Sequence, residues 1–438
     1  MNLTSSVNSE IHGAVNCPGD KSISQRALMV GAFINQNIII DGFLHGSDPL
    51  STMGALNQIG AEITIADDNL IQLKRRSFAF EESLMPLNLG NSGTGLRLML
   101  GLTSGLGLNL EFGGDSSLSQ RPMGRVIDPL SQMGASIKSI DGMLPISIKQ
   151  TLLKENFSYE LPVASAQVKS SILLAGLAAG VSVKVIEPIQ TRDHTERMLK
   201  YFGADIEIIS ENSKNIIQLS SGSKLKPLNY KVVGDISSAA FLIVGALITQ
   251  SPELKIFNVG MNPSRTGVLT ALKKMGANIK ATNQRVECGE PCADLVVRPS
   301  RLKGVELSGD IIPNIIDEIP ILSIAAAFAE GDTIIRDAKE LRVKESDRLQ
   351  AVSDGFKKLG VVHNNFDDGM SIHGKPGDLL LTEPIALESH DDHRIAMSFL
   401  IAGLKCSQPV TVHDCENILT SFPNFLDLTS SVGYKIEK

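Results

Sequence analysis

Apolar and polar positions along the chain follow a pattern that occurs six times. It is clearest where an apolar residue is followed by glycine and usually by a second small residue, as in ALNQIGAEI, PLSQMGASI, MLKYFGADI, ALKKMGANI, GFKKLGVVH and LTSSVGYKI. The glycines, 69 to 84 residues apart, are Gly60, Gly134, Gly203, Gly276, Gly360 and Gly433. Glycine accepts the left-handed conformation that ends many helices, and alternating apolar residues after it predict a strand. Each copy therefore predicts a helix end followed by a strand.

A second series of six segments lies upstream of these glycines and predicts buried helices. Each joins a polar start to a run of small and apolar residues: PGDKSISQRALMVGAF, GNSGTGLRLMLGL, VASAQVKSSILLAGL, GDISSAAFLIVGALI, NIIDEIPILSIAAAF and HDDHRIAMSFLIAGL. A third series begins more amphipathic helices: HGSDPLSTMGAL, SQRPMGRVIDPL, IQTRDHTERML, NPSRTGVLTAL, RVKESDRLQAV and TSFPNFLDL. With β-rich stretches such as 37–40 and 182–186 between them, the pattern predicts an α/β protein of six β-α-β-α-β-β units, each of about 70 residues, in two groups of three.

The polar residues at the helix starts indicate the kind of ligand that the repeat binds. A solenoid of helix-strand repeats is the plain alternative, but its repeated positions would be mainly apolar packing residues. Here charged and small residues gather at the helix N-termini instead. Free backbone N–H groups and the positive end of the helix dipole both favour negative charge at such ends. The sequence therefore predicts anionic ligands.

Composition narrows the class of protein further. The chain has 438 residues, of which 42% are apolar and 20% charged, so it can bury a large core in roughly two to four domains. A net charge of −7 and the absence of tryptophan weigh against a nucleic-acid binder. The N-terminus does not resemble a signal peptide, and no apolar run approaches the roughly 18 residues of a membrane span, so we expect a cytoplasmic protein without membrane contact.

The five cysteines are spread over the chain and predict reduced thiols rather than a disulfide framework. Cys288 and Cys292 have the spacing of half a zinc site, but no second pair of ligands stands at a suitable distance in the sequence. We therefore expect no metal.

Three segments carry small, hydroxyl and cationic residues at predicted helix starts. Residues 18–26 place a lysine, two serines and an arginine across a first turn, like a phosphate cradle without Walker spacing. Residues 89–97 contain three glycines that permit close approach to a ligand, although a tight turn would explain them as well. Arg121 stands before a proline suited to the first helical position. Solvated cap residues remain the alternative for Arg121 and for residues 18–26.

Charged runs occur at 192–194, 342–348 and 390–394, at the same phase of the repeat. On a surface helix such runs usually form salt bridges of little energetic value. Asp317 is more telling, because isoleucines flank it and a partly desolvated carboxylate is a plausible base. Glu318 is its rival for that role.

Taken in order, these segments resemble one family over essentially the full length of the chain. The motifs are Lys21-Ser22-x-x-x-Arg26-Ala27-Leu28, Gly90-Asn91-Ser92-Gly93-Thr94, Arg121-Pro122, Ser165-x-Gln167, Arg342-Val343-Lys344-Glu345-Ser346-Asp347-Arg348 and Asp392-His393-Arg394. The set resembles the 5-enolpyruvylshikimate-3-phosphate synthase family. The resemblance implies two lobes of three repeats, joined by two crossover strands, with the active site in the cleft between them. Residues 21–235 would form the first lobe, and 1–20 with 236–438 the second.

The resemblance also implies a reaction. The enolpyruvyl group of phosphoenolpyruvate would pass to the 5-hydroxyl of shikimate 3-phosphate through a tetrahedral intermediate, with release of phosphate. This step leads to chorismate and the aromatic amino acids, and the family is the target of glyphosate. No cofactor and no partner beyond these substrates is implied, and the protein would be a monomer. Each substrate carries a phosphate and a carboxylate, which accounts for the many lysines and arginines.

Roles in the family carry over to the matching positions. The resemblance implies catalysis by Lys21, Asp317 and Glu345. For shikimate 3-phosphate it implies contacts from Lys21, Ser22, Arg26, Ser165, Gln167, Arg192, Asp317 and Lys344. For phosphoenolpyruvate it implies contacts from Lys21, Gly93, Thr94, Arg121, Gln167, Arg348 and Arg394.

Two positions depart from the family pattern, and two rival functions remain. Thr420 stands where many members have lysine, and Gly93 stands where a glyphosate-tolerant branch, otherwise similar in this loop, has alanine. UDP-N-acetylglucosamine enolpyruvyl transferase is the enzymatic rival, but its reactive cysteine is missing from residues 115–123. A non-catalytic anion-binding protein of the same fold is the other.

Overall fold

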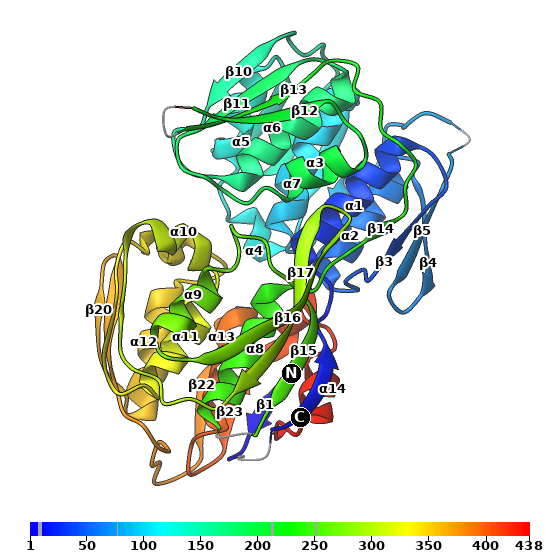
Figure 1. The fold of residues 1–438 in the computed structure, drawn as a ribbon. Coiled ribbons are helices and arrows are strands. Elements are labelled where there is room, and N and C mark those ends of the chain that lie inside the picture. Colours follow the sequence, from blue (N-terminus) through cyan, green and yellow to red (C-terminus); the bar gives the residue numbers. More distant parts are fainter. Residues whose placement is uncertain (8–10, 77, 212–213, 250–251) are drawn as a thin grey trace. The chain divides into compact units, whose positions relative to one another are not determined.

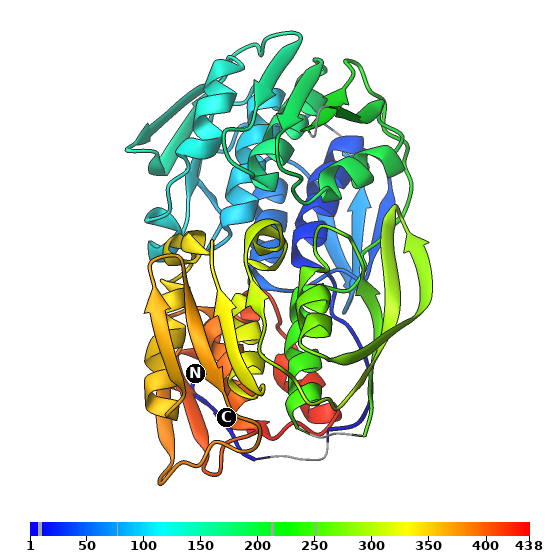
Figure 2. The ribbon, with the colours of Figure 1, turned by 60° about the vertical axis from the view of Figure 1, so that its left-hand side comes forward.

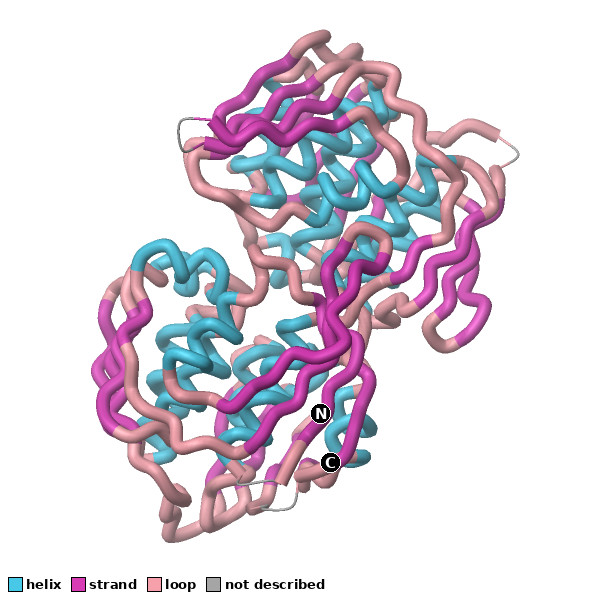
Figure 3. The backbone as a smooth tube through the Cα atoms, in the orientation of Figure 1, coloured by secondary structure: helices cyan, strands magenta, loops and turns pink. Residues whose placement is uncertain are grey.

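The computed structural model describes residues 1–7, 11–76, 78–211, 214–249 and 252–438. The chain separates into two compact units. Unit 1 comprises 1–18, 233–286 and 291–438, and unit 2 comprises 19–232 with the short segment 287–290. Within each unit, helices lie on the inside and strands on the outside (Figure 3).

Three four-stranded sheets form the outer layer of unit 2. In spatial order they are β14 (Tyr230–Lys231), β3 (Ile38–Asp41), β5 (Leu70–Lys74) and β4 (Glu62–Asp67); β6 (Leu87–Asn88), β7 (Leu110–Gly113), β9 (Met143–Lys149) and β8 (Ser136–Ile140); and β10 (Phe157–Glu160), β11 (Val183–Glu187), β13 (Lys214–Leu219) and β12 (Ile206–Glu211). In each sheet the first pair is parallel and the next two pairs are antiparallel. The three sheets therefore share one topology.

The helices of unit 2 divide into an inner and an outer set (Figure 1). The buried inner helices are α1 (Lys21–Ile34), α3 (Gly93–Leu106) and α6 (Ala166–Ala179). The outer helices are α2 (Ser47–Gln58), α4 (Ser116–Ser119), α5 (Gly124–Gln132) and α7 (His194–Tyr201). Helix α3 packs closely on α6, and glycine makes this possible. A side chain at Gly101 or Gly105 would overlap the backbone of Ser171 or Ala175.

Unit 1 repeats this design. Its sheets are, in spatial order, β2 (Gly13–Asn16), β15 (Leu254–Gly260), β17 (Glu290–Arg298) and β16 (Asn278–Glu287); β18 (Glu306–Leu307), β19 (Gly331–Ile335), β21 (Gly369–Gly374) and β20 (Val362–Phe366); and β22 (Ile385–Glu388), β23 (Val410–His413), β1 (Leu3–Ser5) and β24 (Ile436–Glu437). The inner helices α8 (Ile236–Ile248), α11 (Ile319–Ala327) and α13 (His393–Gly403) pack on one another. The others are α9 (Gly267–Lys274), α10 (Ile312–Ile315), α12 (Arg348–Leu359), α14 (Phe425–Ser431) and the 3₁₀ helices η1 (Gly309–Ile311), η2 (Lys339–Val343) and η3 (Cys415–Thr420).

The predicted fold class, six β-α-β-α-β-β repeats in two groups of three, is confirmed. All six glycines predicted to end helices have positive φ, between 71° and 111°. Figure 2 shows the same chain from a second side, with strands along the outside of both units. Helix-ending chemistry in the sequence thus marked the repeat correctly.

Three strands do not pair within the repeat that the chain order suggests. Strand β2 precedes α1 in the sequence but pairs with β15 of unit 1. Strand β14 precedes α8 but pairs with β3 of unit 2. Strand β1, at the N-terminus, inserts between β23 and β24 of the last repeat. The first and fourth repeats thus exchange their first strands, and the sixth is completed by residues 3–5.

The described residues contain neither a candidate membrane-spanning helix nor a candidate metal site. None of their helices is both long and apolar enough to cross a membrane. No group of three or more histidine, cysteine, aspartate or glutamate side chains among them has the arrangement of a metal site.

Cysteine reactivity tests the packing of unit 1. Burial raises the pKa of the Cys406 thiol to about 12 and that of the Cys415 thiol to about 11. Because the thiolate is the reactive form, we expect an aromatic disulfide reagent at pH 8 to leave both residues unmodified in the folded protein. All five thiols should react in guanidinium chloride, as peptide mass spectrometry would show. Rapid labelling of either residue in the native state would contradict this packing.

Candidate active site

The first cluster of predicted site residues begins at the start of α1. The N-cap Asp20 accepts a hydrogen bond from the backbone N–H of Ile23 at 2.9 Å and fixes the first turn. Lys21 follows, and its Nζ lies 2.9 Å from Oδ2 of Asp48 on α2. Lys21 is partly exposed and Asp48 is buried, so the ammonium is held by a carboxylate while it stays accessible.

A buried glutamine connects this helix start to the glycine-rich loop. Gln25 Nε2 donates to Ser92 Oγ at 2.6 Å and to Thr52 Oγ1 at 3.0 Å. Ser92 is the N-cap of α3 and also accepts from the backbone N–H of Gly95 at 3.0 Å. The starts of α1 and α3 are therefore fixed relative to each other by side-chain hydrogen bonds.

The glycine-rich loop lies against two arginines. A Cβ at Gly93 would lie 3.1 Å from Nη1 of Arg97 and 3.3 Å from Nη1 of Arg121. Arg97 Nη1 donates to Gln167 Oε1 at 3.0 Å, and Gln167 Nε2 donates to Thr94 Oγ1 at 2.8 Å. Two guanidinium groups and an amide thus converge beside Gly93, whose missing side chain lets the two guanidinium groups lie close to the loop.

Arg26 and Arg192 are two further cations of unit 2, and their charges affect each other. Arg26 donates from Nε to Thr195 Oγ1 at 2.8 Å, from Nη2 to Ser170 Oγ at 3.1 Å and from Nη1 to the Ser22 carbonyl at 2.9 Å. Burial lowers its pKa to about 10, and the positive charge of Arg192 adds to this effect. Two neighbouring guanidinium groups in a partly buried place favour a multiply charged anion.

Ser165, the N-cap of α6, completes the predicted residues of unit 2. Its Oγ accepts from the backbone N–H of Val168 at 3.4 Å. The structure therefore places nine predicted residues at the starts of α1, α3 and α6 or just before α5 and α7: Lys21, Ser22, Arg26, Gly93, Thr94, Arg121, Ser165, Gln167 and Arg192.

Arg348 is the centre of the cluster in unit 1. The guanidinium is buried, with Nε 2.8 Å from Asp392 Oδ2, Nη2 2.7 Å from Glu345 Oε2 and Nη1 3.4 Å from Asp317 Oδ1. Burial acts to lower its pKa, but the three carboxylates outweigh burial and raise it. Arg348 is therefore a permanent cation, and three carboxylates surround it.

Lys344 and Arg394 extend this cluster. Lys344 Nζ lies 3.5 Å from Oδ1 of Asp317. Arg394 Nη1 donates to the backbone carbonyl of Asp317 at 2.8 Å and pairs with Glu318 Oε1 at 3.2 Å. All five predicted residues of unit 1, Asp317, Lys344, Glu345, Arg348 and Arg394, are thus brought together.

The two rival carboxylates have different surroundings. Glu318 is 1% exposed and is held by Arg394 and by the hydroxyl of Ser237. The Asp317 side chain is 16% exposed and lies at the edge of the cluster beside Lys344 and Arg348. Glu318 is therefore buried as the partner of Arg394, whereas the Asp317 carboxylate stays partly accessible.

Sequence reasoning missed two residues that help to build these clusters, Arg97 and Asp48, and it considered Glu318 only as a possible base. Arg97 stands four residues after Gly93 on α3. Residues four apart lie on the same face of a helix, so this spacing could have indicated that Arg97 points toward Gly93. Asp48 pairs with Lys21, and Glu318 pairs with Arg394.

Thr420 stands where many members of the resembled family have lysine. Its hydroxyl donates to the carbonyl of Asn417 at 2.7 Å and so caps η3 locally, without a positive charge.

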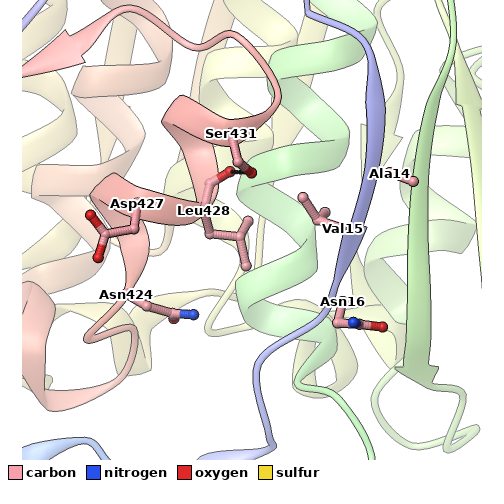
Figure 4. Close-up of a pocket in the computed structure, with 7 residues that line it drawn as sticks. All are labelled: Ala14, Val15, Asn16, Asn424, Asp427, Leu428 and Ser431. Carbon is pink, nitrogen blue, oxygen red and sulfur yellow. Dashed lines mark hydrogen bonds between the residues drawn. The ribbon is translucent and has the colours of Figure 1, made fainter.

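A hollow of about 390 Å³ lies in unit 1, away from these side chains. It is lined by Ala14, Val15, Asn16, Asn424, Asp427, Leu428 and Ser431 (Figure 4). Among the described residues, the only charged lining group is the carboxylate of Asp427, so the hollow does not suit an anion.

Comparison with solved structures first defines the class. The enolpyruvyl transferase NikO from Streptomyces tendae superposes with a TM-score of 0.79 over 100% of this chain and 98% of its own, at 18% identity. That likeness concerns the fold alone. EPSP synthase from Acinetobacter baumannii superposes with a TM-score of 0.87 at 43% identity, over 100% of this chain and 99% of its own. The fold is that of the enolpyruvyl transferases.

Sequence comparison defines the family. The model of the EPSP synthase family, 3-phosphoshikimate 1-carboxyvinyltransferase, matches residues 6–428. The 3-phosphoshikimate 1-carboxyvinyltransferase of Vesicomyosocius okutanii is 46% identical over 427 residues, 97% of this chain and 96% of that protein. The chain belongs to the EPSP synthase family.

The buried ion cluster around Arg348 gives a prediction about stability. We expect Asp392→Asn to lower the free energy of unfolding by about 3 kcal/mol, because it leaves a buried cation without its fully buried partner. Urea denaturation would measure this. Asp354→Asn, in the exposed Lys357–Asp354 pair of α12, is the matched control and should cost less than about 0.5 kcal/mol. Equal effects of the two substitutions would contradict this assignment.

Proposed function

We infer that the chain transfers the enolpyruvyl group of phosphoenolpyruvate to the 5-hydroxyl of shikimate 3-phosphate and releases phosphate, in the pathway to the aromatic amino acids. Family membership over residues 6–428 carries this conclusion. The clusters of the two units supply the chemistry, because both substrates carry a phosphate and a carboxylate that need several fixed cations. UDP-N-acetylglucosamine transfer is not favoured, since the similar curated proteins are 3-phosphoshikimate 1-carboxyvinyltransferases.

For shikimate 3-phosphate we propose contacts from both units. Arg26 and Arg192 are neighbouring cations suited to a dianionic phosphate. Asp317 would accept hydrogen bonds from ring hydroxyls, with Lys344 beside it. The full proposed set is Lys21, Ser22, Arg26, Ser165, Gln167, Arg192, Asp317 and Lys344.

For phosphoenolpyruvate we propose the arginines of the glycine-rich loop and of the unit 1 cluster. Gly93 lets Arg121 lie close to the loop backbone, and Arg348 and Arg394 are held by carboxylates that fix their direction. Arg97, bound to Gln167, joins this group on geometric grounds. The set carried over from the family is Lys21, Gly93, Thr94, Arg121, Gln167, Arg348 and Arg394.

The proposed chemistry is addition followed by elimination. Asp317 takes the proton of the 5-hydroxyl as its oxygen bonds to C2 of phosphoenolpyruvate, and Glu345 in its acid form delivers a proton to C3. In the second step C3 returns a proton to Glu345, the double bond forms again, and the C2–O bond to phosphate breaks. Lys21 protonates the leaving phosphate. Asp317 then gives up its proton to solvent and Lys21 regains one, so that atoms and charges balance over the full cycle without a cofactor.

Two further properties belong to this proposal. We place the enzyme in the cytoplasm, where phosphorylated metabolites of this kind are made and consumed. We take the monomer as its working state, because catalytic groups of every required type come from a single chain.

Lys21 provides the direct test of the reaction. We expect phosphate release from phosphoenolpyruvate with shikimate 3-phosphate and none with UDP-N-acetylglucosamine. Lys21→Ala should lower kcat/KM by about 100-fold or more, because it removes a proton donor and a phosphate contact. Lys214→Ala breaks an exposed lysine–glutamate pair in the same unit and should leave the rate unchanged. Turnover with neither acceptor would favour a non-catalytic anion-binding protein.

Gly93 provides a test of the inhibitor site. We expect Gly93→Ala to raise the inhibition constant of glyphosate about tenfold, because a methyl group beside Arg97 and Arg121 would crowd the inhibitor. The KM for phosphoenolpyruvate should rise less. Gly54→Ala on α2 is the matched control, since its added methyl group meets no atom within 4 Å. An unchanged inhibition constant for Gly93→Ala would count against this account.

A further inference from the structure

A cluster of three charged side chains lies in the core of unit 2, apart from the residues assigned above. Lys169 Nζ on α6 is 2.9 Å from Glu187 Oε1 at the end of β11 and 2.7 Å from Glu196 Oε1 on α7. The three side chains are 1%, 2% and 1% exposed. One buried ammonium therefore joins a strand and two helices.

Stability alone is a weak reason for this cluster. Taking charges out of water is costly, and apolar side chains of similar volume often stabilise a core equally well. Burial acts to lower the pKa of Lys169, but Glu196 and Glu187 outweigh it and raise that pKa. The second oxygen of Glu196, Oε2, is buried without a hydrogen-bond partner among the described residues. Burial also raises the pKa of Glu196, against the opposing effect of Lys169. A cluster with two carboxylates, one lysine and one unpartnered oxygen is therefore a costly way to stabilise a core, which calls for another role.

Glu187 fixes the loop that carries Arg192. It accepts a hydrogen bond from the backbone N–H of Thr191 at 2.9 Å and another from the Thr191 hydroxyl. Thr191 directly precedes Arg192, and the following residue, Asp193, pairs with Arg197 at 2.9 Å. The backbone is therefore held on both sides of Arg192.

Glu196 and Lys169 help to hold Arg26 through the residues beside them in the chain, Thr195 and Ser170. Thr195 accepts from Arg26, and so does Ser170, the residue after Lys169. The Thr195 and Ser170 hydroxyls also bond to each other at 2.7 Å. The negative charge of Glu196 stabilises the charged form of Arg26 as well. Lys169 thus joins the two segments that hold Arg26 and Arg192.

We propose that Lys169 is a positioning residue for the acceptor substrate: through Glu187 and Glu196 it keeps Arg26 and Arg192 side by side, so that both can bind the phosphate of shikimate 3-phosphate. The physical need is that two guanidinium groups repel each other until the anion arrives, and the hydrogen-bonded frame around Lys169 holds their segments against that repulsion. This inference rests on the assignment of Arg26 and Arg192 to shikimate 3-phosphate.

The test is the affinity of Lys169→Met for each substrate. We expect the dissociation constant of shikimate 3-phosphate, measured by calorimetry, and its KM to rise about tenfold. The KM for phosphoenolpyruvate at saturating acceptor and kcat should stay within about twofold of the wild type, because the lysine touches neither substrate nor reacting atoms. Thr191→Val, which removes one hydrogen bond to Glu187, should shift the same constant in the same direction by a smaller factor.

Two controls separate positioning from general loosening of the fold. Leu174→Ala leaves a cavity in the same buried helix and should lower Tm without changing the affinity for shikimate 3-phosphate. Arg192→Ala tests the underlying assignment and should weaken binding of the same substrate. If Arg192→Ala binds normally, the site assignment fails, and the role of Lys169 fails with it.

Two results would overturn the role of Lys169 while leaving the site assignment standing. One is normal affinity of Lys169→Met for shikimate 3-phosphate when Arg192→Ala binds weakly. The other is an equal loss of affinity for both substrates. Should Lys169→Met not fold, Thr191→Val decides alone: an unchanged dissociation constant would reject the proposal.

Discussion

Repulsion between cations that must lie close together is the constraint on which both clusters depend. Arg348 stays charged in the core of unit 1 because Asp392, Glu345 and Asp317 surround it. In unit 2, Lys21 is held by Asp48, and Arg26 is stabilised by the charge of Glu196. A carboxylate that fixes a cation costs some of its attraction for an anion, but it prevents the cation from turning into solvent. The supporting carboxylates are therefore part of the proposed anion sites.

The repeat explains where these charges lie. The inner helices begin at a capping aspartate or serine in five of six cases: Asp20, Ser92, Ser165, Asp235 and Asp392. The caps satisfy backbone N–H groups and leave the following turn to carry cations or small residues. The start of α8 carries no predicted ligand contact and instead holds Glu318 in place. At the start of α8, Arg265 donates to Asp235 and Ser237, and the Ser237 hydroxyl bonds to Glu318, the partner of Arg394.

Much of this could be predicted from the sequence. Helix-ending glycines and polar helix starts identified six repeats, because backbone conformation and capping depend on residues close in the chain. The motifs of the resembled family named residues that do gather in each unit. Other partners carried no local signal. Lys169 lies within an apolar helix pattern, and its partners follow 18 and 27 residues later, so their contact depends on how α6, β11 and α7 pack.

The sequence by itself determined the repeat and indicated anionic ligands, since both follow from residue type and short-range spacing, and its resemblance to a family supplied the list of candidate residues. Only the tertiary structure decided which strands complete which sheet, with β2 and β14 exchanged and β1 inserted into the last repeat. It also separated Asp317 from its neighbour Glu318, one at the edge of the cluster and the other buried against Arg394. The physical reason is common to these cases: strand pairing and charge pairing join atoms far apart in the chain, and their energies depend on burial that no local pattern records.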